Sequence, residues 1–263
     1  KAITSPFLTG NLFSLKNKVV LITGAGRGIG KYLAEQIVKQ DAIVFSIDKK
    51  FQKKIPKKIK NIFEIECDIT DQPKFKKVCS EIIKKKKRID VLINNAGVSM
   101  ANKESGKMYE KDKWDKTIEI NLTSHFVCSQ EVIKYMKKQK NGSIINITSI
   151  NAELGFPRNP AYVASKGGLK MLGKSLAKDW GKYGIRVNNL GPGYIRTDMT
   201  GKTYSNKKLK LERAQHTMLG RWGEKEDLVG PCIFLASDAS KYMTGQDVYV
   251  DGGWISNSLI TEL

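Results

Sequence analysis

Short apolar runs alternate with helix-like segments along almost the whole chain, and this alternation constrains the fold more than any other feature. The apolar runs are nearly continuous, which is typical of parallel strands buried on both faces. The strand-like runs cover residues 19–23, 43–48, 61–66, 91–94, 143–148, 186–190 and 248–250. Helical patterns cover residues 28–40, 73–86, 113–139, 160–183 and 224–236.

A chain with this order is expected to adopt the doubly wound α/β (Rossmann) fold, a parallel sheet of about seven strands with helices on both faces. No internal repeat or Pro/Ser-rich linker divides the sequence, so residues 1–263 are predicted to form a single domain. Residues 49–60 hold seven lysines and Pro56, which predicts a solvated loop. Residues 200–219 lie between a strand and the last helix, and a small lid over about residues 198–220 is expected there.

Composition excludes several classes of protein. With 40% hydrophobic and 27% charged residues, the chain is neither disordered nor collagen-like. No apolar run reaches the roughly 18–20 residues that cross a bilayer, and residues 1–12 lack the apolar stretch of a signal peptide, so no membrane association is expected. The cysteines form no Cys-x-x-Cys pair and only two histidines accompany them, so neither a metal site nor a disulfide framework is expected. We expect reduced thiols and a cytoplasmic location for the four residues Cys67, Cys79, Cys128 and Cys232.

The formal net charge is +20, a property shared with proteins that bind nucleic acids or anionic membranes. However, 39 of the 46 basic residues are Lys and only seven are Arg, whereas surfaces that read DNA favour the forked guanidinium of Arg. The excess is therefore interpreted as a solvated, lysine-rich surface, and no nucleic-acid partner is expected. A non-catalytic protein that binds dinucleotides or nucleic acid is kept as a remote alternative.

A glycine-rich segment follows the first strand-like run and opens the first helix. It reads Thr-Gly-Ala-Gly-Arg-Gly-Ile-Gly over residues 23–30. Glycines let the backbone turn sharply and approach a pyrophosphate closely, and a helix N-terminus supplies free N–H groups and positive potential. In this strand–turn–helix context the segment predicts a dinucleotide-binding site.

The end of the second strand-like run indicates which dinucleotide is bound. Asp48 stands 18 residues after Gly30, where a carboxylate can accept hydrogen bonds from the adenosine ribose hydroxyls and would repel a 2′-phosphate. Arg27, Lys49 and Lys50 favour the opposite choice, because each could face that phosphate. Asp48 is given the greater weight, so NAD is expected as the cofactor and NADP is less favoured.

Three further side chains predict proton-transfer chemistry. Tyr162 and Lys166 are four residues apart in a helical segment, so they share one face. A nearby ammonium is expected to lower the pKa of the phenol from its usual value of about 10, which makes Tyr162 a candidate general acid and base. Ser149 follows the fifth strand-like run, at the carboxyl edge where open α/β sheets bind ligands.

Together these residues resemble the short-chain dehydrogenase/reductase family over about residues 12–254. The matching motifs, in chain order, are the glycine-rich segment, Asn94-Asn95-Ala96-Gly97, Asn121, Ser149, Tyr162-x-x-x-Lys166, Pro192-Gly193 with Ile195 and Thr197, and Val250-Asp251-Gly252-Gly253. The resemblance implies an NAD(P)-dependent enzyme that interconverts a secondary alcohol and a ketone by hydride transfer. It also implies a homotetramer in which the helices that bear Asn121 and Tyr162 meet at one interface.

The resemblance implies a role for each matched residue. Tyr162 would exchange a proton with the substrate oxygen, Lys166 would bind the nicotinamide ribose, Ser149 would orient the substrate oxygen, and Asn121 would hold a water in a proton relay. The implied cofactor-binding residues are Gly24, Arg27, Gly28, Ile29, Gly30, Asp48, Asp68, Ile69, Asn95, Ala96, Gly97, Tyr162, Lys166, Pro192, Gly193, Ile195 and Thr197.

Within the family, the chain looks most like the gluconate 5-dehydrogenase branch, which acts on sugar acids and polyols, because Glu153-Leu154-Gly155 and Arg221-Trp222-Gly223 resemble that branch. A 3-oxoacyl thioester reductase is the alternative. A sugar acid needs a cation near its carboxylate, yet no basic residue follows Asn94–Gly97 until Lys103, so Lys103, Arg158 and Arg213 are the candidates. The expected substrate-contacting residues are Ser149, Asn151, Glu153, Arg158, Asn159 and Tyr194. His125, one helical turn after Asn121, is expected to be a hydrogen-bonded core or interface histidine.

Overall fold

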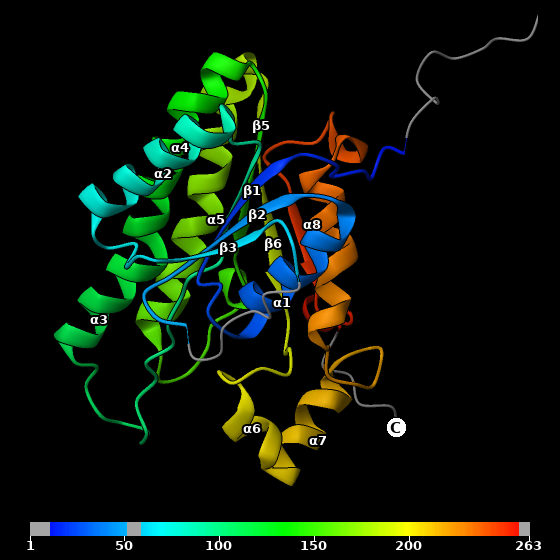
Figure 1. The fold of residues 1–263 in the computed structure, drawn as a ribbon. Coiled ribbons are helices and arrows are strands. Elements are labelled where there is room, and N and C mark those ends of the chain that lie inside the picture. Colours follow the sequence, from blue (N-terminus) through cyan, green and yellow to red (C-terminus); the bar gives the residue numbers. More distant parts are fainter. Residues whose placement is uncertain (1–10, 52–58, 258–263) are drawn as a thin grey trace, which may run out of the picture.

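The computed structural model describes residues 11–51 and 59–257, so most of the loop predicted over residues 49–60 lies outside the described residues. Seven parallel strands form one sheet in the order β3-β2-β1-β4-β5-β6-β7 (Figure 1). They are β1 (Val19–Thr23), β2 (Ile43–Asp48), β3 (Ile62–Glu66), β4 (Val91–Asn94), β5 (Gly142–Ile147), β6 (Ile185–Pro192) and β7 (Asp247–Val250). The predicted fold class is confirmed.

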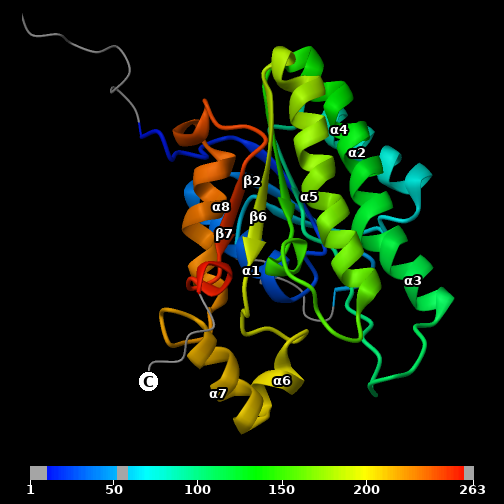
Figure 2. The same ribbon diagram turned by 180° about the vertical axis from the view of Figure 1, so that it is seen from behind.

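Helices cover both faces of the sheet (Figures 1 and 2). On one face lie α1 (Gly28–Ile37) and α8 (Val229–Ala236), and on the other lie α2 (Gln72–Lys86), α4 (Ser124–Gln139) and α5 (Pro160–Trp180). Short 3-10 segments are η1 (Val38–Gln40), η3 (Ile150–Ala152), η4 (Gly181–Tyr183), η5 (Lys225–Leu228), η6 (Asp238–Ser240) and η7 (Trp254–Ser256). The last predicted helix, over residues 224–236, therefore begins as the 3-10 turn η5 before it becomes α8.

The two layers of helices explain why the strand-like runs are continuously apolar. Successive residues of a strand point to opposite faces of the sheet. Val19 and Leu21 join the hydrophobic core beneath α2, α4 and α5, whereas Val20 and Ile22 join the core beneath α1 and α8. Because both faces are covered, every position of β1 is buried and favours an apolar side chain.

The helix predicted over residues 113–139 is interrupted in the structure. A π-helical turn, η2 (Glu119–Thr123), joins α3 (Lys111–Ile118) to α4. The Ser124 hydroxyl donates to the carbonyl oxygen of Glu119 at 2.8 Å, inside this turn. The spacing of apolar residues did not predict the π-turn. Such a turn adds one residue to the helix, so it shifts the apolar residues that follow by only a single position. Such turns are frequent at functional sites, and this one carries Asn121.

The segment predicted as a lid forms two short helices beyond the carboxyl edge of the sheet, α6 (Gly201–Ser205) and α7 (Lys207–His216) (Figure 2). Asn206 begins α7, and its side-chain oxygen accepts a hydrogen bond from the Leu209 N–H at 3.1 Å. Trp222 anchors the segment, since its indole N–H donates to the carbonyl oxygen of Lys210 at 2.9 Å and its ring lies edge-on to Tyr204.

A row of buried polar side chains crosses the middle of the sheet. Asn94, Asn146, Asn189 and Asp247 are register partners on β4, β5, β6 and β7. Asn94 Nδ2 donates to Asn146 Oδ1 at 3.0 Å, Asn146 Nδ2 donates to Asn189 Oδ1 at 3.0 Å, and Asn189 Nδ2 donates to Asp247 Oδ1 at 2.7 Å. We call the three asparagines the asparagine ladder. In-register neighbours on one face of a sheet are close enough for such pairing.

The asparagine ladder fixes α5 on the sheet. Asn189 Nδ2 also donates to the carbonyl oxygen of Lys170, in α5, at 3.0 Å. The helix comes so close to the ladder that a Cβ at Gly173 would lie 2.4 Å from Asn189 Oδ1. Since α5 also carries Tyr162 and Lys166, the ladder determines the height and rotation of both side chains relative to the strand ends.

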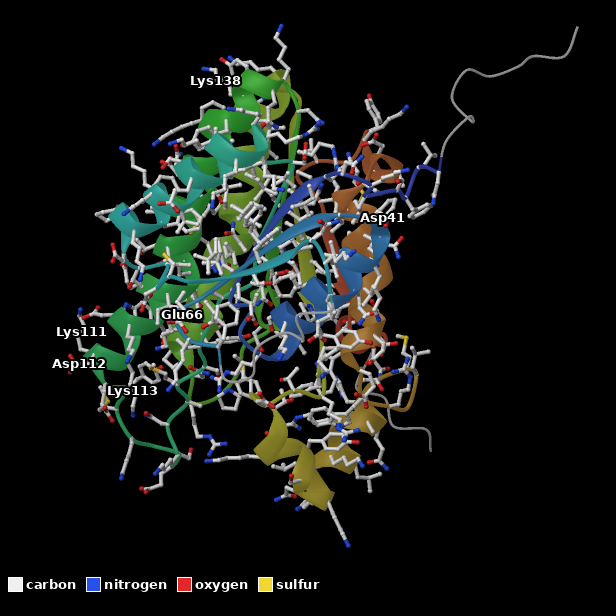
Figure 3. All side chains as sticks on the ribbon, viewed as in Figure 1. Asp41, Glu66, Lys111, Asp112, Lys113 and Lys138 are labelled. Carbon is white, nitrogen blue, oxygen red and sulfur yellow. The ribbon has the colours of Figure 1, made fainter. Side chains whose placement is uncertain are left out.

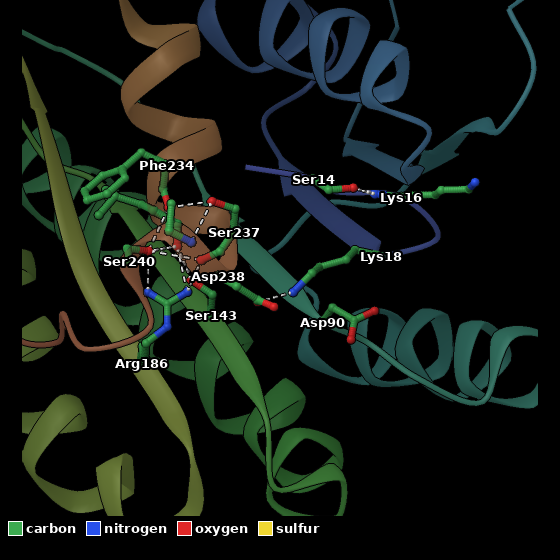
Figure 4. Close-up of polar contacts among 12 residues, drawn as sticks. Ser14, Lys16, Lys18, Asp90, Ser143, Arg186, Phe234, Ser237, Asp238 and Ser240 are labelled. Atoms are coloured by element: carbon green, nitrogen blue, oxygen red, sulfur yellow. Dashed lines mark hydrogen bonds and ion pairs between the residues drawn. The ribbon is translucent and has the colours of Figure 1, made fainter. Parts of the chain in front are cut away.

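A second polar cluster lies at the amino edge of the sheet, where the strands begin (Figure 4). Arg186 donates to the carbonyl oxygens of Leu235 and Ser237, at 3.0 and 3.1 Å, and to the Ser240 hydroxyl at 2.8 Å. A guanidinium at the end of α8 satisfies carbonyl groups that the helix leaves unpaired. Lys18 bonds Asp238 nearby at 2.8 Å. These contacts explain the polar residues at this edge as structural.

Charged side chains are spread over the molecule rather than gathered on one face (Figure 3). Lys138 lies at the far end of α4, whereas Lys111 and Lys113 lie at the start of α3, where Lys111 pairs with Asp115 and Lys113 pairs with Glu110, both at 2.6 Å. Within residues 11–51 and 59–257, no helix has the length and apolarity needed to span a membrane, and no cluster of three metal-ligating side chains is present. All four cysteines are buried and unpaired.

Candidate active site

A cleft of about 550 Å³ opens at the carboxyl edge of the sheet, where the strand order reverses between β1 and β4. Ligands of open α/β proteins bind at this kind of edge. The cleft collects most residues that the resemblance implied for a cofactor, namely Gly24, Arg27, Gly28, Ile29, Asp48, Asp68, Ile69, Asn95, Ala96, Gly97, Tyr162, Lys166, Pro192, Gly193, Ile195 and Thr197. Ser149 lines the same cleft.

Gly30 is the one predicted cofactor residue that does not line the cleft, and packing explains it. A Cβ at this position would lie 2.3 Å from Asn95 Nδ2 and 2.5 Å from the carbonyl oxygen of Gly24. Asn95 Nδ2 in turn donates to the carbonyl oxygens of Thr23 and Gly24, at 2.9 and 3.0 Å. Gly30 therefore lets α1 approach the loop that Asn95 holds in place.

The glycine-rich loop has the backbone geometry of an anion cradle. Gly24 and Gly28 have φ values of +66° and +59°, a region that favours glycine. Nothing lies within 4 Å of a Cβ built on Gly28, so the N-terminus of α1 is open to a ligand. Free N–H groups and the positive helix end at this point suit a phosphate.

The carboxylate of Asp48 is held at the tip of β2. Its Oδ2 accepts the Gly26 N–H at 2.8 Å and its Oδ1 accepts the Lys50 N–H at 3.2 Å. The first bond joins the second strand to the glycine-rich loop, and the second closes the turn that follows the strand. Arg27 and Lys49 line the same end of the cleft, so a carboxylate and two cations face the expected adenosine position.

Ser149, Tyr162 and Lys166 meet at the other end of the cleft. Ser149 lies directly after the end of β5, and Tyr162 and Lys166 lie in the first two turns of α5. The buried Lys166 ammonium donates to the carbonyl oxygen of Ile147 at 2.7 Å and lies 5.7 Å from the centre of the Tyr162 ring. Three side chains from two elements thus share one wall.

The pKa of Tyr162 does not follow the expected direction. Burial raises the pKa of Tyr162 above its ordinary value of 10.0, and the hydrogen bond with the Ser149 side chain lowers it by less. The proximity of Tyr194 raises it further. Lys166 has little influence because its ammonium is directed at the Ile147 carbonyl, and burial lowers its own pKa to about 8. The predicted lowering of the phenol pKa by Lys166 is therefore wrong for the protein without cofactor.

Asn121 lies behind the cleft wall, fully buried, with its side chain engaged by the protein. Its Nδ2 donates to the Val98 carbonyl oxygen at 2.9 Å and to the Ser165 hydroxyl at 3.1 Å, and its Oδ1 accepts the Val98 N–H at 2.8 Å. These bonds use both side-chain donors. Asn121 therefore ties the segment after β4 to α5. A water in the expected proton relay would have to hydrogen-bond to the backbone carbonyl of Asn121.

His125 lies one turn further along, and its expected position in the core is confirmed, whereas the expected hydrogen bond is not found. The residue is fully buried, and neither ring nitrogen has a hydrogen-bond partner among the described residues. Burial, reinforced by the nearby charge of Lys166, lowers the pKa of His125 from 6.5 to about 3, although the Ala96 backbone opposes this shift. The folded protein therefore holds a neutral imidazole next to the cleft wall.

Replacing His125 with leucine should weaken the acid sensitivity of the protein. Between pH 3 and 6.5, His125 is protonated in the unfolded chain and neutral in the folded protein. The free energy of unfolding therefore falls as the pH drops through this window. From pH 7 to about pH 4.5, the wild type should lose about 2–3 kcal/mol more unfolding free energy than His125→Leu. Urea titrations across this pH range measure the unfolding free energy of each protein, and His216→Leu is the control. Parallel pH profiles would contradict the buried neutral imidazole.

The candidate substrate residues are divided between the cleft and its surroundings. Ser149 lines the cleft, whereas Asn151, Glu153, Arg158, Asn159 and Tyr194 do not. Asn151 accepts a hydrogen bond from the Ser149 hydroxyl at 3.3 Å. Asn159 is buried and donates to the Ser99 hydroxyl at 2.8 Å, so both asparagines support residues of the cleft wall.

Glu153 and Arg158 are engaged outside the cleft. The Glu153 carboxylate pairs with Lys170 and accepts the Tyr249 hydroxyl at 2.5 Å, and these two contacts lower its pKa. Arg158 donates to the backbone oxygen of Lys103 at 2.9 Å on the exposed surface. The structure does not bring either residue to the substrate end, so these two expectations of direct substrate contact are not met in its geometry.

Tyr194 belongs to an aromatic cluster beneath the lid. Its ring lies 5.2 Å from that of Trp222 and 4.8 Å from that of Trp254. His216, at the end of α7, packs on Trp254 at 4.1 Å. Tyr194 thus stands between the lid and Tyr162, whose pKa it raises.

Sequence reasoning missed several residues of the cleft. The lining residues that were not named individually are Cys67, Val98, Ser99, Met100, Ile120, Ile147, Thr148, Asp198, Met199 and Thr200, of which the last three fall in the segment expected to form the lid. Most flank a recognised motif in the chain, so extending each motif by three residues would have found them. Ile120 directly precedes Asn121, so the same extension covers it, but the sequence did not reveal the π-turn that holds both residues.

The chain is similar to known proteins over nearly its whole length. A family model described as Enoyl-(Acyl carrier protein) reductase matches residues 24–255. Gluconate 5-dehydrogenase of Gluconobacter oxydans is 35% identical, over 92% of this chain and 96% of that protein. The 3-oxoacyl-(acyl-carrier-protein) reductase of Staphylococcus epidermidis is 36% identical, over 90% of this chain and 98% of that protein.

A solved structure gives the same picture. The gluconate 5-dehydrogenase from Burkholderia cenocepacia, in complex with NADP and tartrate, superposes with a TM-score of 0.86. It is 32% identical, and the match covers 94% of this chain and 98% of that chain. Likeness of this extent includes the sheet, both helical layers and the carboxyl-edge cleft.

Proposed function

The chain belongs to the short-chain dehydrogenase/reductase family, and on this premise we propose that it interconverts a secondary alcohol and a ketone on a sugar acid or a related small polyol, with NAD as cofactor. Membership makes it an oxidoreductase that acts on CH–OH groups. The observation that carries the proposal is the meeting of Ser149, Tyr162 and Lys166 in one cleft with the glycine-rich loop.

The described residues fit a dinucleotide. The open N-terminus of α1 at Gly28 would hold the pyrophosphate, and Asp48 would accept the adenosine ribose hydroxyls. A Lys166 ammonium has three donors, of which one meets Ile147, leaving donors for the nicotinamide ribose. The bound cofactor supplies or accepts the hydride.

The protein residues would manage the proton. The Ser149 hydroxyl is placed to orient the substrate oxygen beside Tyr162. In reduction, the Tyr162 phenol would give its proton to the carbonyl oxygen as the carbonyl carbon gains the hydride. In oxidation the phenolate would take the proton back. Because burial raises the pKa of Tyr162, the phenol carries its proton at neutral pH before the cofactor binds, which is the form that donates in reduction.

The proposed preference for NAD rests on Asp48. The solved relative from Burkholderia cenocepacia holds NADP, so the preference of this chain has to be tested directly. Replacing Asp48 with asparagine keeps an acceptor for the Gly26 N–H and removes the negative charge. The wild type should bind NADH at least tenfold more tightly than NADPH. Asp48→Asn should narrow this ratio by about tenfold or more, because the repulsion of a 2′-phosphate is lost.

Fluorescence titration of the reduced cofactors measures both affinities. Glu66→Gln is the matched control, because Glu66 is an exposed carboxylate at the tip of the neighbouring strand β3. An equal affinity of the wild type for NADH and NADPH would refute the preference and leave the oxidoreductase activity standing.

The 3-oxoacyl thioester reductase is the second candidate, because one such enzyme is 36% identical over 90% of this chain. Purified protein should be assayed by absorbance of the reduced nicotinamide with 5-dehydrogluconate, with neutral ketoses and with acetoacetyl thioester. We expect the highest kcat/KM with the sugar acid. Preference for the thioester would support the second candidate, and absence of hydride transfer with every compound would sink the proposal.

Further properties complete the proposal. We place residues 1–263 in a single domain, with residues 198–220 as a lid, because α6 and α7 stand over the edge that carries the cleft. Four unpaired cysteines suit a reducing compartment such as the cytoplasm. A homotetramer through α4 and α5 is supported by Phe126 and Met171, which are partly exposed there. No nucleic acid or membrane is proposed as a partner.

A further inference from the structure

We propose that Arg213, on α7 of the lid, binds the carboxylate of an acidic substrate. This inference rests on the proposed function and identifies the group that would select a sugar acid over a neutral polyol. It follows from three features of the described residues: the charge of the cleft wall, the incomplete hydrogen bonding of Arg213, and its position relative to Tyr194 and Tyr162.

The cleft itself offers a substrate carboxylate little positive charge. Arg27 and Lys49 stand at the adenosine end, and Lys166 is turned toward Ile147 beneath Tyr162. Besides Tyr162 and Lys166, the lining residues that flank the substrate motifs are Val98, Ser99, Met100, Ser149, Asp198, Met199 and Thr200, and none of these is a cation. A carboxylate that leaves water needs a paired charge, and a basic residue of the lid can supply it.

Arg213 has an unused donor. Its Nε is buried and has no hydrogen-bond acceptor among the described residues, and its Nη1 lies 3.9 Å from the carboxylate of the neighbouring Glu212. Buried donors are rarely left unpaired in folded proteins. A carboxylate from a ligand would supply the missing acceptor, and the planar guanidinium fork suits it.

Arg213 also contacts Tyr194, which is close to the reacting groups. Its guanidinium carbon is 5.2 Å from the centre of the Tyr194 ring, and it forms a hydrogen bond with the Tyr194 side chain. Tyr194 in turn is close enough to Tyr162 to influence it electrostatically. The three residues thus run in sequence from the lid to the proposed proton donor.

The other arginines near the lid are already engaged. Arg221 holds Asp227 through two bonds, at 2.7 and 3.0 Å. Arg196 lies 3.7 Å from the Glu224 carboxylate, and its guanidinium covers Tyr204. Among these three guanidinium groups, Arg213 is the one with a buried donor lacking an acceptor.

The test compares an acid with its neutral analogue. Gluconate and glucitol are offered to the wild type, to Arg213→Met and to Lys208→Met, which removes an exposed charge from the same helix. In Arg213→Met, the ratio of kcat/KM for gluconate to kcat/KM for glucitol should fall about 10- to 100-fold, because a charged hydrogen bond is lost. The change should come chiefly from a higher KM for gluconate. Lys208→Met should keep the wild-type ratio, and Arg213→Lys should recover part of it.

Calorimetric titration of gluconate into the NADH-saturated protein separates the outcomes. Loss of gluconate binding in Arg213→Met but not in Lys208→Met supports the inference, even if the wild type turned over neither compound and the proposed function failed. An unchanged ratio and unchanged gluconate affinity in Arg213→Met would overturn the inference while leaving the oxidoreductase function intact. Loss of glucitol turnover equal to that of gluconate would assign Arg213 to lid structure instead.

Discussion

Replacing Tyr162 with phenylalanine is expected to lower kcat by about 10²- to 10⁴-fold, the contribution of a positioned general acid or base. The substitution removes one oxygen from a side chain that hydrogen-bonds with Ser149 and leaves the ring in place. The Lys166 bond to Ile147 does not involve the phenol, so NADH affinity should stay within about threefold of the wild type. Steady-state kinetics with the best substrate measures the first effect, and cofactor titration measures the second.

The matched control is Tyr183→Phe, because Tyr183 lies just beyond the distal end of the helix that carries Tyr162 and packs on Trp180. Its kcat should equal that of the wild type. If Tyr162→Phe retained more than a tenth of the wild-type kcat, another group would have to supply the proton, and the proposed mechanism would fail even if the reaction class stood.

Replacing Asn146 with leucine should destabilise the fold more than an ordinary substitution. Asn146 is the central member of the asparagine ladder, accepting from Asn94 and donating to Asn189 at 3.0 Å each. Leucine would leave both partners buried and short of one hydrogen bond, at about 1–3 kcal/mol each. A total loss of about 3–5 kcal/mol in unfolding free energy is expected.

Urea unfolding followed by circular dichroism measures this loss. Asn141→Leu, at an exposed position just before the same strand, is the control and should change stability by less than about 0.5 kcal/mol. Because the ladder seats α5, Asn146→Leu should also lower kcat in the fraction that stays folded. A stability within 1 kcal/mol of the wild type would mean that the ladder is not a determinant of the fold.

The cofactor half of the cleft was largely predictable from sequence. The residues from Gly24 to Gly30 form the turn after β1 and the first residues of α1, so their local pattern is sufficient to define an anion cradle. Asp48 was predictable for the same reason, since it ends a strand. The substrate half was predictable only in part. Ser149 was found from its position after a strand, whereas the contact between Arg213 and Tyr194 joins two separate segments and depends on the path of the chain.

Two residues show how tertiary contacts overrule a local expectation. Glu153 is near Ser149 in sequence, yet Lys170 and Tyr249 hold its carboxylate outside the cleft. His125 occupies a helical position where a hydrogen-bonded imidazole was expected, yet the packing around it supplies no partner among the described residues. In each case the deciding neighbours come from other elements.

The seven strands, most of the helices between them and the phosphate-binding loop could be predicted from the amino-acid sequence, because each depends on short-range periodicity or on glycines at fixed spacing. The tertiary structure alone decided the π-turn at Asn121, the asparagine ladder beneath α5 and the placing of Arg213 beside Tyr194. These features depend on hydrogen bonds and packing between side chains from different elements. Such contacts exist only once the sheet has brought those elements together.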